Sequence, residues 1–448
     1  MPEWCLRFGI VQSAKKPETK PGESTLKSPT AKTPAVSSNR YAEQLIELGV
    51  ASGLHRVGVT SADVLNRARE VLTARKSLGL HNEMQFTYRN PIRSTDPTST
   101  MPAARSIIVG ARSYATQMPI KPDEVSARVA RYAWADYYEL LRFGLGQIAT
   151  QLKADGWRAI VLADDNSIVD REVAYQAGLG WYGKNANLLI EGAGSYFVLG
   201  SVVTDAPLQP STKTVKDGCG SCQRCIDNCP TQAIIAPGVV DARKCLAWLL
   251  QKPGVFDSAY RVALGDRLYG CDDCQEVCPP TVRNAIVEQT QGKTRAWASV
   301  MSVLESDDEI LLKNFKAWYI ADRDPKWLRR NALIILGNIG DALDERTQIV
   351  LKRYLIDREP ILRAHAVWAT ARLGLHNLLP SRDDRPNCSS RTRHIAERKV
   401  ATDEASTCNE RFSTQNRRHS ERSLRVVAPS AAREFCCVDQ PLSRFARL

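Results

Sequence analysis

Hydrophobic positions between residues 41 and 212 follow two different spacings. Leu45, Ile46, Leu48, Val50 and Leu54 recur as on one face of a helix. Short apolar runs within residues 57–60, 105–114 and 159–162 predict buried strands, and residues 137–154 repeat the helical spacing. Strands separated by helices predict an α/β (α+β) domain, in which helices pack on a sheet.

The helical spacing returns between about residues 310 and 375. Two segments match there at an offset of 34 residues, which pairs Arg329 with Arg363 and Ala332 with Ala366. This match predicts two HEAT-like helical repeats. The polar ends have no such periodicity and are predicted to be disordered. The predicted division is therefore a tail at 1–39, an α/β domain at 40–212, a cysteine-rich segment at 213–290, helical repeats at 291–376 and a tail at 377–448.

The composition is that of a folded, soluble chain, but most of its excess positive charge lies in the two terminal segments. Of 448 residues, 43% are hydrophobic, and the formal net charge is +12. Residues 1–40 and 376–448 hold most of that excess, so any nucleic-acid site in the middle must be a local patch. No run of about 18 apolar residues occurs, and the N-terminal residues do not resemble an export signal. We expect a cytoplasmic monomer with reduced thiols and no membrane-spanning helix.

Eight cysteines have the most specific spacing in the chain. Four form the run Cys219-x2-Cys222-x2-Cys225-x3-Cys229, followed by a proline, as in bacterial ferredoxins. A second run, Cys271-x2-Cys274-x3-Cys278, also precedes a proline, and Cys245 completes the set of eight. Two four-iron clusters need eight thiolates, so the spacing predicts a ferredoxin-like domain with two 4Fe-4S clusters.

The ferredoxin pattern also predicts how the ligands are shared, because the last cysteine of each run binds the other cluster. One cluster is then held by Cys219, Cys222, Cys225 and Cys278, and the other by Cys229, Cys245, Cys271 and Cys274. The alternative is structural zinc, which also binds thiolates in Cys-x2-Cys pairs. Two clusters in series indicate electron transfer from an external donor, such as a ferredoxin or flavodoxin, to an acceptor elsewhere in the chain.

A glycine-rich stretch at residues 178–183 matches the dinucleotide motif G-x-G-x-x-G. In a dinucleotide fold the first strand leads directly into the first glycine. Here a charged stretch that includes Asp170, Arg171 and Glu172 separates them. The motif is therefore interpreted as a coincidence, and a nicotinamide site is disfavoured.

The stretch Asp164-Asp165-Asn166-Ser167-Ile168-Val169-Asp170-Arg171, with the glycine-rich segment through Asn185 and Gly194-Ser195-Tyr196-Phe197, resembles epoxyqueuosine reductases. The resemblance extends over residues 41 to about 375, including Arg267-Leu268-Tyr269-Gly270-Cys271. The chain departs from many relatives at Tyr138, where histidine is common, and at Ala247, where serine often occurs.

This resemblance implies a cobalamin enzyme that converts epoxyqueuosine in a tRNA anticodon loop to queuosine. It implies that Asp164 donates the proton, and that Arg93, Asp164, Lys184, Leu188 and Leu199 contact cobalamin. Lys326, Arg329, Arg330 and Arg363, at equivalent turns of the predicted repeats, would form a basic stripe for the tRNA phosphates. Without the resemblance, Asp164 fits a turn or helix-capping aspartate better.

Two other function classes compete with this interpretation. A cobalamin-dependent reductive dehalogenase also combines a corrin with two clusters, but such enzymes usually have a twin-arginine leader. A non-catalytic ferredoxin module fused to a binding domain would leave Asp164 and its surrounding motif unexplained. Binding of tRNA separates the expected enzyme from the first class, and cobalamin-dependent turnover separates it from the second.

Overall fold

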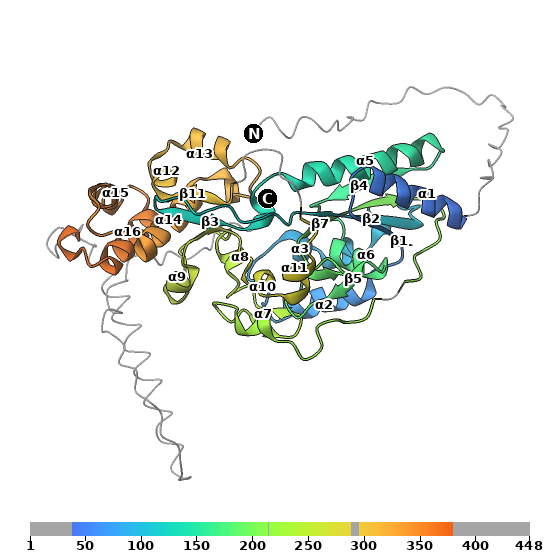
Figure 1. Ribbon diagram of the computed structural model, residues 1–448, viewed down its shortest axis with the longest axis horizontal. Coiled ribbons are helices and arrows are strands. Elements are labelled where there is room, and N and C mark those ends of the chain that lie inside the picture. The colour runs from blue at the N-terminus through green and yellow to red at the C-terminus, as the bar shows by residue number, and fades with distance from the viewer. Residues whose placement is uncertain (1–37, 214, 288–294, 380–448) are drawn as a thin grey trace, which may run out of the picture.

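The computed structural model describes residues 38–213, 215–287 and 295–379. The predicted disordered tails lie almost wholly outside these ranges. In the described part of the chain, no helix is long and apolar enough to cross a membrane. Figure 1 shows an elongated molecule with a helix-covered sheet at one end and a helical unit at the other.

The N-terminal unit is built around a four-stranded sheet with the order β1-β2-β7-β4. Every neighbouring pair in it is antiparallel. The three predicted strands are confirmed, whereas the central strand β7 was not predicted. The elements of this unit are α1 (Ser38–Ala51), β1 (Arg56–Ser61), α2 (Asn66–Ser77), α3 (Phe86–Arg89), α4 (Pro91–Ser94), β2 (Ser106–Ser113), α5 (Tyr137–Ala154), β4 (Ala159–Ala163), α6 (Asp170–Gln176), β5 (Gly180–Tyr182), β6 (Leu188–Ile190) and β7 (Phe197–Thr204).

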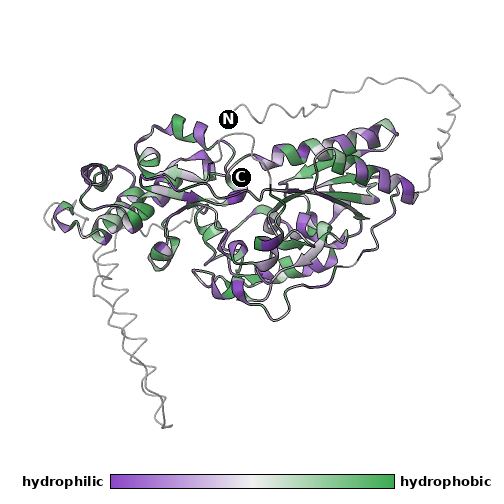
Figure 2. Cartoon of the chain, in the orientation of Figure 1, coloured by the Kyte–Doolittle hydropathy of each residue, from purple (hydrophilic) through white to green (hydrophobic). Residues whose placement is uncertain are grey.

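Helices cover both faces of this sheet. Successive strand residues point to opposite faces, so Ile108 of β2 packs with α1 and α5 while Ile107 and Val109 pack on the α6 side. All three are fully buried. Figure 2 shows hydrophobic strands between helices whose outward faces are hydrophilic. The resulting three layers explain why the strands form nearly continuous apolar runs in the sequence.

The cysteine-rich segment consists of short elements connected by turns. They are α7 (Arg224–Asp227), β8 (Ile234–Ala236), β9 (Val239–Val240), α8 (Leu246–Leu249), α9 (Ser258–Leu264), β10 (Arg267–Tyr269), α10 (Asp273–Glu276) and α11 (Pro279–Asn284). A small sheet of order β10-β3-β11 joins this segment to the others, since β3 (Ser126–Val129) comes from the N-terminal unit and β11 (Trp297–Ser299) begins the helical unit.

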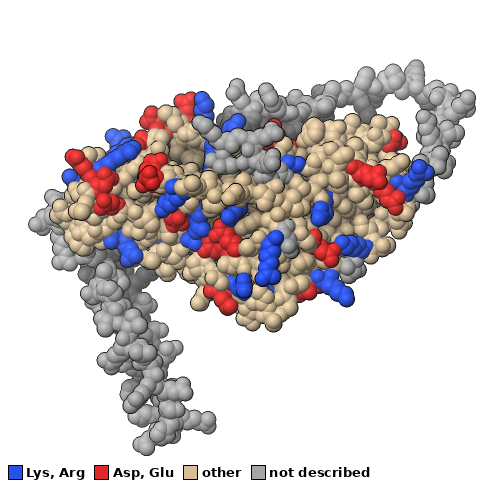
Figure 3. Space-filling view, in the orientation of Figure 1, with Lys and Arg blue, Asp and Glu red and all other residues tan. Residues whose placement is uncertain are grey.

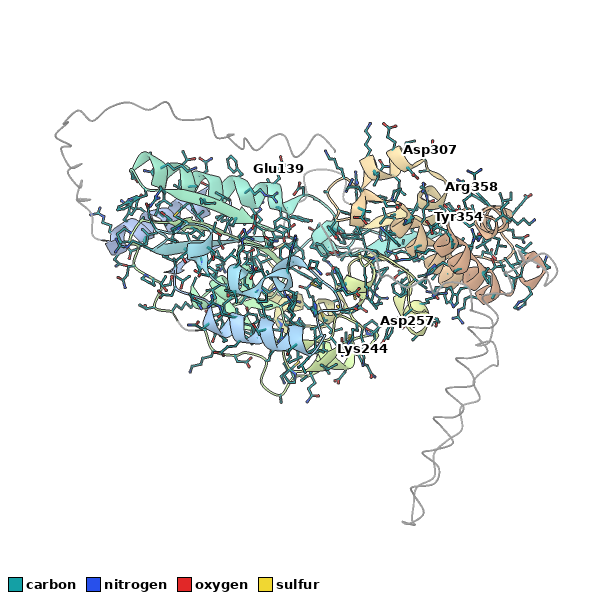
Figure 4. All side chains as sticks on the ribbon, turned by 180° about the vertical axis from the view of Figure 1, so that it is seen from behind. Glu139, Lys244, Asp257, Asp307, Tyr354 and Arg358 are labelled. Carbon is teal, nitrogen blue, oxygen red and sulfur yellow. The ribbon has the colours of Figure 1, made fainter. Side chains whose placement is uncertain are left out.

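The C-terminal unit is helical, as predicted. Its helices are α12 (Val300–Glu305), α13 (Asp308–Asn314), α14 (Lys326–Ile339), α15 (Glu345–Leu355) and α16 (Pro360–Arg372). Ala332 of α14 and Ala366 of α16, which match at the 34-residue offset, are both fully buried where these helices pack. In Figure 4, Lys244 and Asp257 of the cysteine-rich segment lie between Glu139 of α5 and Tyr354 of α15.

Candidate functional site

Four of the eight cysteines line one cavity. Its volume is about 350 Å³, and its lining includes Cys219, Cys222, Cys225 and Cys278. These are the four ligands predicted for the first cluster. Burial raises the pKa of the Cys225 thiol, and the neighbouring Cys278 and Cys219 thiols raise it further. The Cys225 thiol therefore disfavours ionisation unless a cation neutralises it, as iron does in a cluster.

The other four cysteines form a second group, in which Cys245, Cys271 and Cys274 are more deeply buried than Cys225 and Cys278 of the first group. Burial raises the pKa of Cys274 well above its ordinary value, and Cys271 and Cys245 add to the effect. Burial likewise raises the pKa of Cys245, to which Cys229 contributes. All eight thiols are free of disulfides. No three His, Cys, Asp or Glu side chains among the described residues are grouped to hold a single ion; a cubane does not require such a group, because each thiolate binds a different iron.

A tight turn between β5 and β6 contacts both cysteine groups. The Lys184 ammonium donates hydrogen bonds to the Gly220 and Cys222 carbonyls, each at 2.8 Å. The next residue, Asn185, donates its side-chain amide to the Cys274 carbonyl at 3.3 Å. Lys184 was expected to contact cobalamin, but its ammonium binds the loop of the first cysteine group. The turn thus fixes the two groups relative to each other.

The Gly194-Ser195 motif has a packing role against α11. Gly194 has a φ of +80°, and a Cβ there would overlap the Thr281 backbone. Ser195 donates from its backbone N–H to Thr281 Oγ1 and from its hydroxyl to Gln275 Oε1. Gln275 in turn donates to Asp272. This buried network joins the N-terminal unit to the segment that carries Cys274 and Cys278.

The loop after β4 places Asp164 in an unusual backbone conformation. Its φ is +55°, in the left-handed region where a non-glycine residue is strained. The following residues are held by α4. Arg93 donates to Asn166 Oδ1 at 3.2 Å and to Ser167 Oγ at 3.0 Å, and the neighbouring Ser94 hydroxyl donates to the Asn166 carbonyl at 2.6 Å. Strain that is held by surrounding contacts is common at functional sites.

The surroundings of Asp164 favour its protonated form. Partial burial raises the pKa of this carboxyl, Arg142 opposes the rise, and the charges of Asp165 and Asp136 add to it. The side chain nevertheless remains exposed on one side. Asp164 can therefore hold a proton at higher pH than an ordinary aspartate and exchange it with water.

A second acid near this loop was missed by the sequence interpretation. Burial raises the pKa of Asp170 to about 8, a hydrogen bond from the Ser201 hydroxyl lowers it, and Asp164 and Asp165 raise it. Ser201 lies on the unpredicted strand β7, opposite Leu162 of β4. Only the charged stretch at residues 170–172 gave a signal in the sequence. The sheet is antiparallel here, so the rule that parallel strands end at a crevice does not apply.

The other residues expected to contact cobalamin are dispersed. Arg93 supports the Asp164 loop, as described above. Leu188 of β6 is buried in the hydrophobic core, and Leu199 of β7 packs against the same core from a half-buried position. Arg93 and Asp164 thus belong to one site, whereas the Leu188 side chain belongs to the core.

The predicted basic stripe is only partly at the surface. Lys326 forms ion pairs with Asp324 and Glu359, Arg329 with Asp308, and Arg363 donates to the Asp357 and Arg358 carbonyls. Arg330 is only 1% exposed. The prediction that Arg330 contacts a phosphate is therefore wrong, because its guanidinium donates to buried carbonyls, among them those of Lys252 and Gly254.

The glycine-rich stretch has no dinucleotide-binding geometry. Gly178 follows the end of α6 with a φ of +71°, and Gly180 begins a hairpin that pairs β5 with β6. A Cβ on Gly180 would overlap the Leu189 carbonyl. Close packing within the hairpin explains the glycines.

Two family models match the chain. One, described as a 4Fe-4S double cluster binding domain, matches residues 218–281, which contain all eight cysteines. This match favours the clusters over structural zinc. The other, described as "Epoxyqueuosine reductase QueG, DUF1730", matches residues 94–164 and ends on Asp164.

Relatives match most of the chain. An epoxyqueuosine reductase of Vibrio cholerae is 33% identical over 343 residues, which cover 74% of this chain and 91% of the relative. A Bacillus subtilis epoxyqueuosine reductase, solved with its catalytic aspartate loop swung out of the active site, has a TM-score of 0.69 at 29% identity and covers 75% of this chain and 90% of that one. An epoxyqueuosine reductase solved with an epoxyqueuosine-modified tRNA-Tyr stem loop has a TM-score of 0.70 at 29% identity, with the same coverage.

Proposed function

The chain belongs to the epoxyqueuosine reductase family, and we propose that it removes the epoxide oxygen of epoxyqueuosine in tRNA to give queuosine. The observation that carries this proposal is the match to a reductase over nine tenths of that relative's length. Loss of the oxygen as water consumes two electrons and two protons. The chain has residues for both requirements, namely eight cluster cysteines and a proton-holding carboxyl.

The electrons reach the substrate through the two clusters, each of which is held by one of the two cysteine groups. The first group lines a cavity next to the surface, and the second lies among buried residues such as Leu246, Asp272 and Gln275. We infer that electrons pass from the first cluster to the second. The Lys184-Asn185 turn, which contacts the backbone of both groups, keeps their separation constant during transfer.

Asp164 is the proposed proton donor. Its raised pKa favours the protonated form more than that of an ordinary aspartate does, and its exposed side allows water to replace the proton after each turnover. Arg93 and Ser94 hold the rest of the loop in place. The mobility of a catalytic aspartate loop in the Bacillus subtilis relative supports a loop that closes on substrate.

The family resemblance also supports cobalamin as the redox cofactor next to Asp164. Cobalamin, when bound, supplies a reduced cobalt centre that delivers electrons to the epoxide. The polar side chains beside the loop fit the polar edge of cobalamin, because the Arg93 guanidinium lies at the same loop as Asp164 and can donate hydrogen bonds. Leu199, half-buried on β7, would contact an apolar part, and Leu188 would contribute backbone only.

For the tRNA, we propose contacts to Lys326, Arg329 and Arg363, which are half-buried on the helical unit. Lys326 pairs with Glu359, which caps the helix that carries Arg363, so these two basic residues lie close together. A tRNA substrate places the enzyme in the cytoplasm. The structure solved with a modified stem loop supports an RNA-binding surface in the family.

The test is conversion of epoxyqueuosine tRNA by anaerobically purified holoenzyme, followed by mass spectrometry of the nucleosides. We expect queuosine from the wild type. Asp164→Asn should keep its iron and cobalamin contents but lose on the order of 10²- to 10⁴-fold in rate, because the amide cannot donate an acidic proton.

Asp205→Asn is the matched control, because it removes an aspartate that pairs with Arg158 away from the loop. It should turn over at the wild-type rate. Full turnover by Asp164→Asn would exclude Asp164 as the donor, and no queuosine from loaded wild-type enzyme would exclude the function.

A further inference from the structure

A second hollow adjoins the cavity of the first cysteine group. Its volume is about 390 Å³, and it is lined by Arg224, Asn228, Glu276, Val277, Pro279, Val282 and Arg283. We call this the α7–α11 hollow. Arg224, Pro279 and Arg283 line both spaces, so the hollow is continuous with the first cysteine group.

The rim of the hollow is basic and partly apolar. Arg224 and Arg283 are exposed, and neither forms an ion pair with another residue in the described ranges. The acid in the hollow, Glu276, is already paired with Arg128 at 3.2 Å and Arg131 at 2.6 Å. Val282 is 62% exposed beside Arg283. Figure 3 shows basic side chains over the region of α7, α10 and α11, with acidic ones beside them.

The α7–α11 hollow lies next to the ligands of the first cluster, where electrons from an external donor would enter the protein. Arg224 lies between the ligands Cys222 and Cys225 in sequence, and most residues from 216 to 224 are exposed. A protein seated on the hollow would therefore sit directly over the first cluster. The second group lies deeper, so electrons from outside enter through the first.

We propose that the α7–α11 hollow docks an acidic one-electron carrier protein, with Arg224 and Arg283 as the steering charges and Val282 as an apolar contact. At each encounter the carrier loses one electron and the first cluster gains it, and two encounters supply the two electrons of one epoxide reduction. The proposal rests on the proposed function and names its electron donor by class. Small, charge-steered interfaces of this kind are typical of transient electron transfer.

The experiment compares Arg224→Glu/Arg283→Glu holoenzyme with the wild type. A pre-reduced acidic [2Fe–2S] ferredoxin is mixed anaerobically with each, and bleaching of the 4Fe-4S absorbance is followed without tRNA. Dithionite, which needs no docking surface, is the parallel reductant. Arg56→Glu/Lys153→Glu, at exposed positions on β1 and α5, is the control of equal charge change. If the double variant binds iron poorly, the single variant Arg283→Glu is tested in its place, because Arg283 lies outside the two cysteine runs.

The double variant should react with ferredoxin at least about tenfold more slowly at low ionic strength and lose most of its salt dependence. Its affinity for oxidised ferredoxin should fall in parallel, while its rate of reduction by dithionite should equal that of the wild type. The control variant should equal the wild type in each of these measurements. Wild-type rates with ferredoxin would overturn the proposal. So would a selective loss of tRNA stem-loop affinity, which would assign the hollow to RNA. Reduction by ferredoxin without any queuosine formation would instead refute the function and leave the docking site standing.

Discussion

At the scale of single residues, two acids near the end of β4 have different environments, Asp164 in the loop after β4 and Asp170 at the start of α6. Asp164 reaches solvent, whereas Asp170 packs against Ser201, and burial raises the pKa of Asp170 to about 8. Asp170 is therefore neutral in the folded protein near pH 7. With Asp170 neutral, Asp165 and Asp136 are the nearby acids whose negative charges raise the pKa of Asp164.

Asp170 makes a pH-dependent contribution to stability. Its pKa rises from 3.8 to about 8 on folding, so the stabilisation is complete below pH 4 and is lost as the pH rises towards 8. Asp170→Asn stays neutral throughout and can still accept from Ser201. We expect this variant to gain stability relative to wild type between pH 4 and 8, by at least about 1 kcal/mol at the upper end. Urea unfolding at several pH values measures the gain, and parallel pH curves for the two proteins would contradict it.

At the scale of elements, α14 stabilises the second cysteine group from the helical unit. Arg330 donates to the carbonyls of Leu249, Leu250, Lys252 and Gly254, which lie at the end of α8 and just after it, following Cys245. Asn331 donates to the Leu250 and Leu268 carbonyls, and Leu268 lies on the strand before Cys271. Two adjacent residues of α14 thus connect the segments that carry two ligands of one cluster.

Arg330→Met should unfold more easily and bind the second cluster poorly. The substitution leaves several buried carbonyls without donors, a loss of about 2–4 kcal/mol. Iron content should fall towards half while the first cluster stays. Arg358→Met, an exposed arginine labelled in Figure 4, should change neither property. Full iron content in Arg330→Met would show that α14 does not position the cluster ligands.

The sequence predicts elements better than it predicts their contacts. Residues 137–154 form a helix as predicted, because the spacing of apolar residues is a local property. Arg330 is placed by the sequence in a basic surface stripe, because the four basic residues lie at equivalent turns of the predicted repeats. Its burial depends on carbonyls about 80 positions earlier, which no local pattern reveals. The pairing of β7 with both β2 and β4 is equally non-local.

In the candidate site, too, the sequence predicts local features better than it predicts contacts between distant residues. The cysteine spacing predicts which thiols meet, because ligands of one metal cluster must satisfy fixed geometry. Lys184 was assigned to cobalamin from its neighbours in sequence, but folding brings it to the Cys222 carbonyl 38 positions away. Asp170 was missed because a helix-starting aspartate is usually exposed.

At the scale of the whole molecule, three units meet around the cysteines. The small β10-β3-β11 sheet takes one strand from each unit, and the buried Ser195–Gln275 network crosses the same boundary. The clusters thus lie at the junction between the Asp164 loop and the helical unit. Under the proposed function, this placement would let one chain receive electrons at α7, hold a proton at Asp164 and contact RNA on the helices.

The central claim is that the eight thiols hold two four-iron clusters in this junction. The most direct measurement is the iron, sulfide and zinc content of chain purified without oxygen, together with its visible absorbance. The account predicts brown protein with about eight iron and eight sulfide per chain. Colourless protein that contains zinc and no sulfide would contradict it.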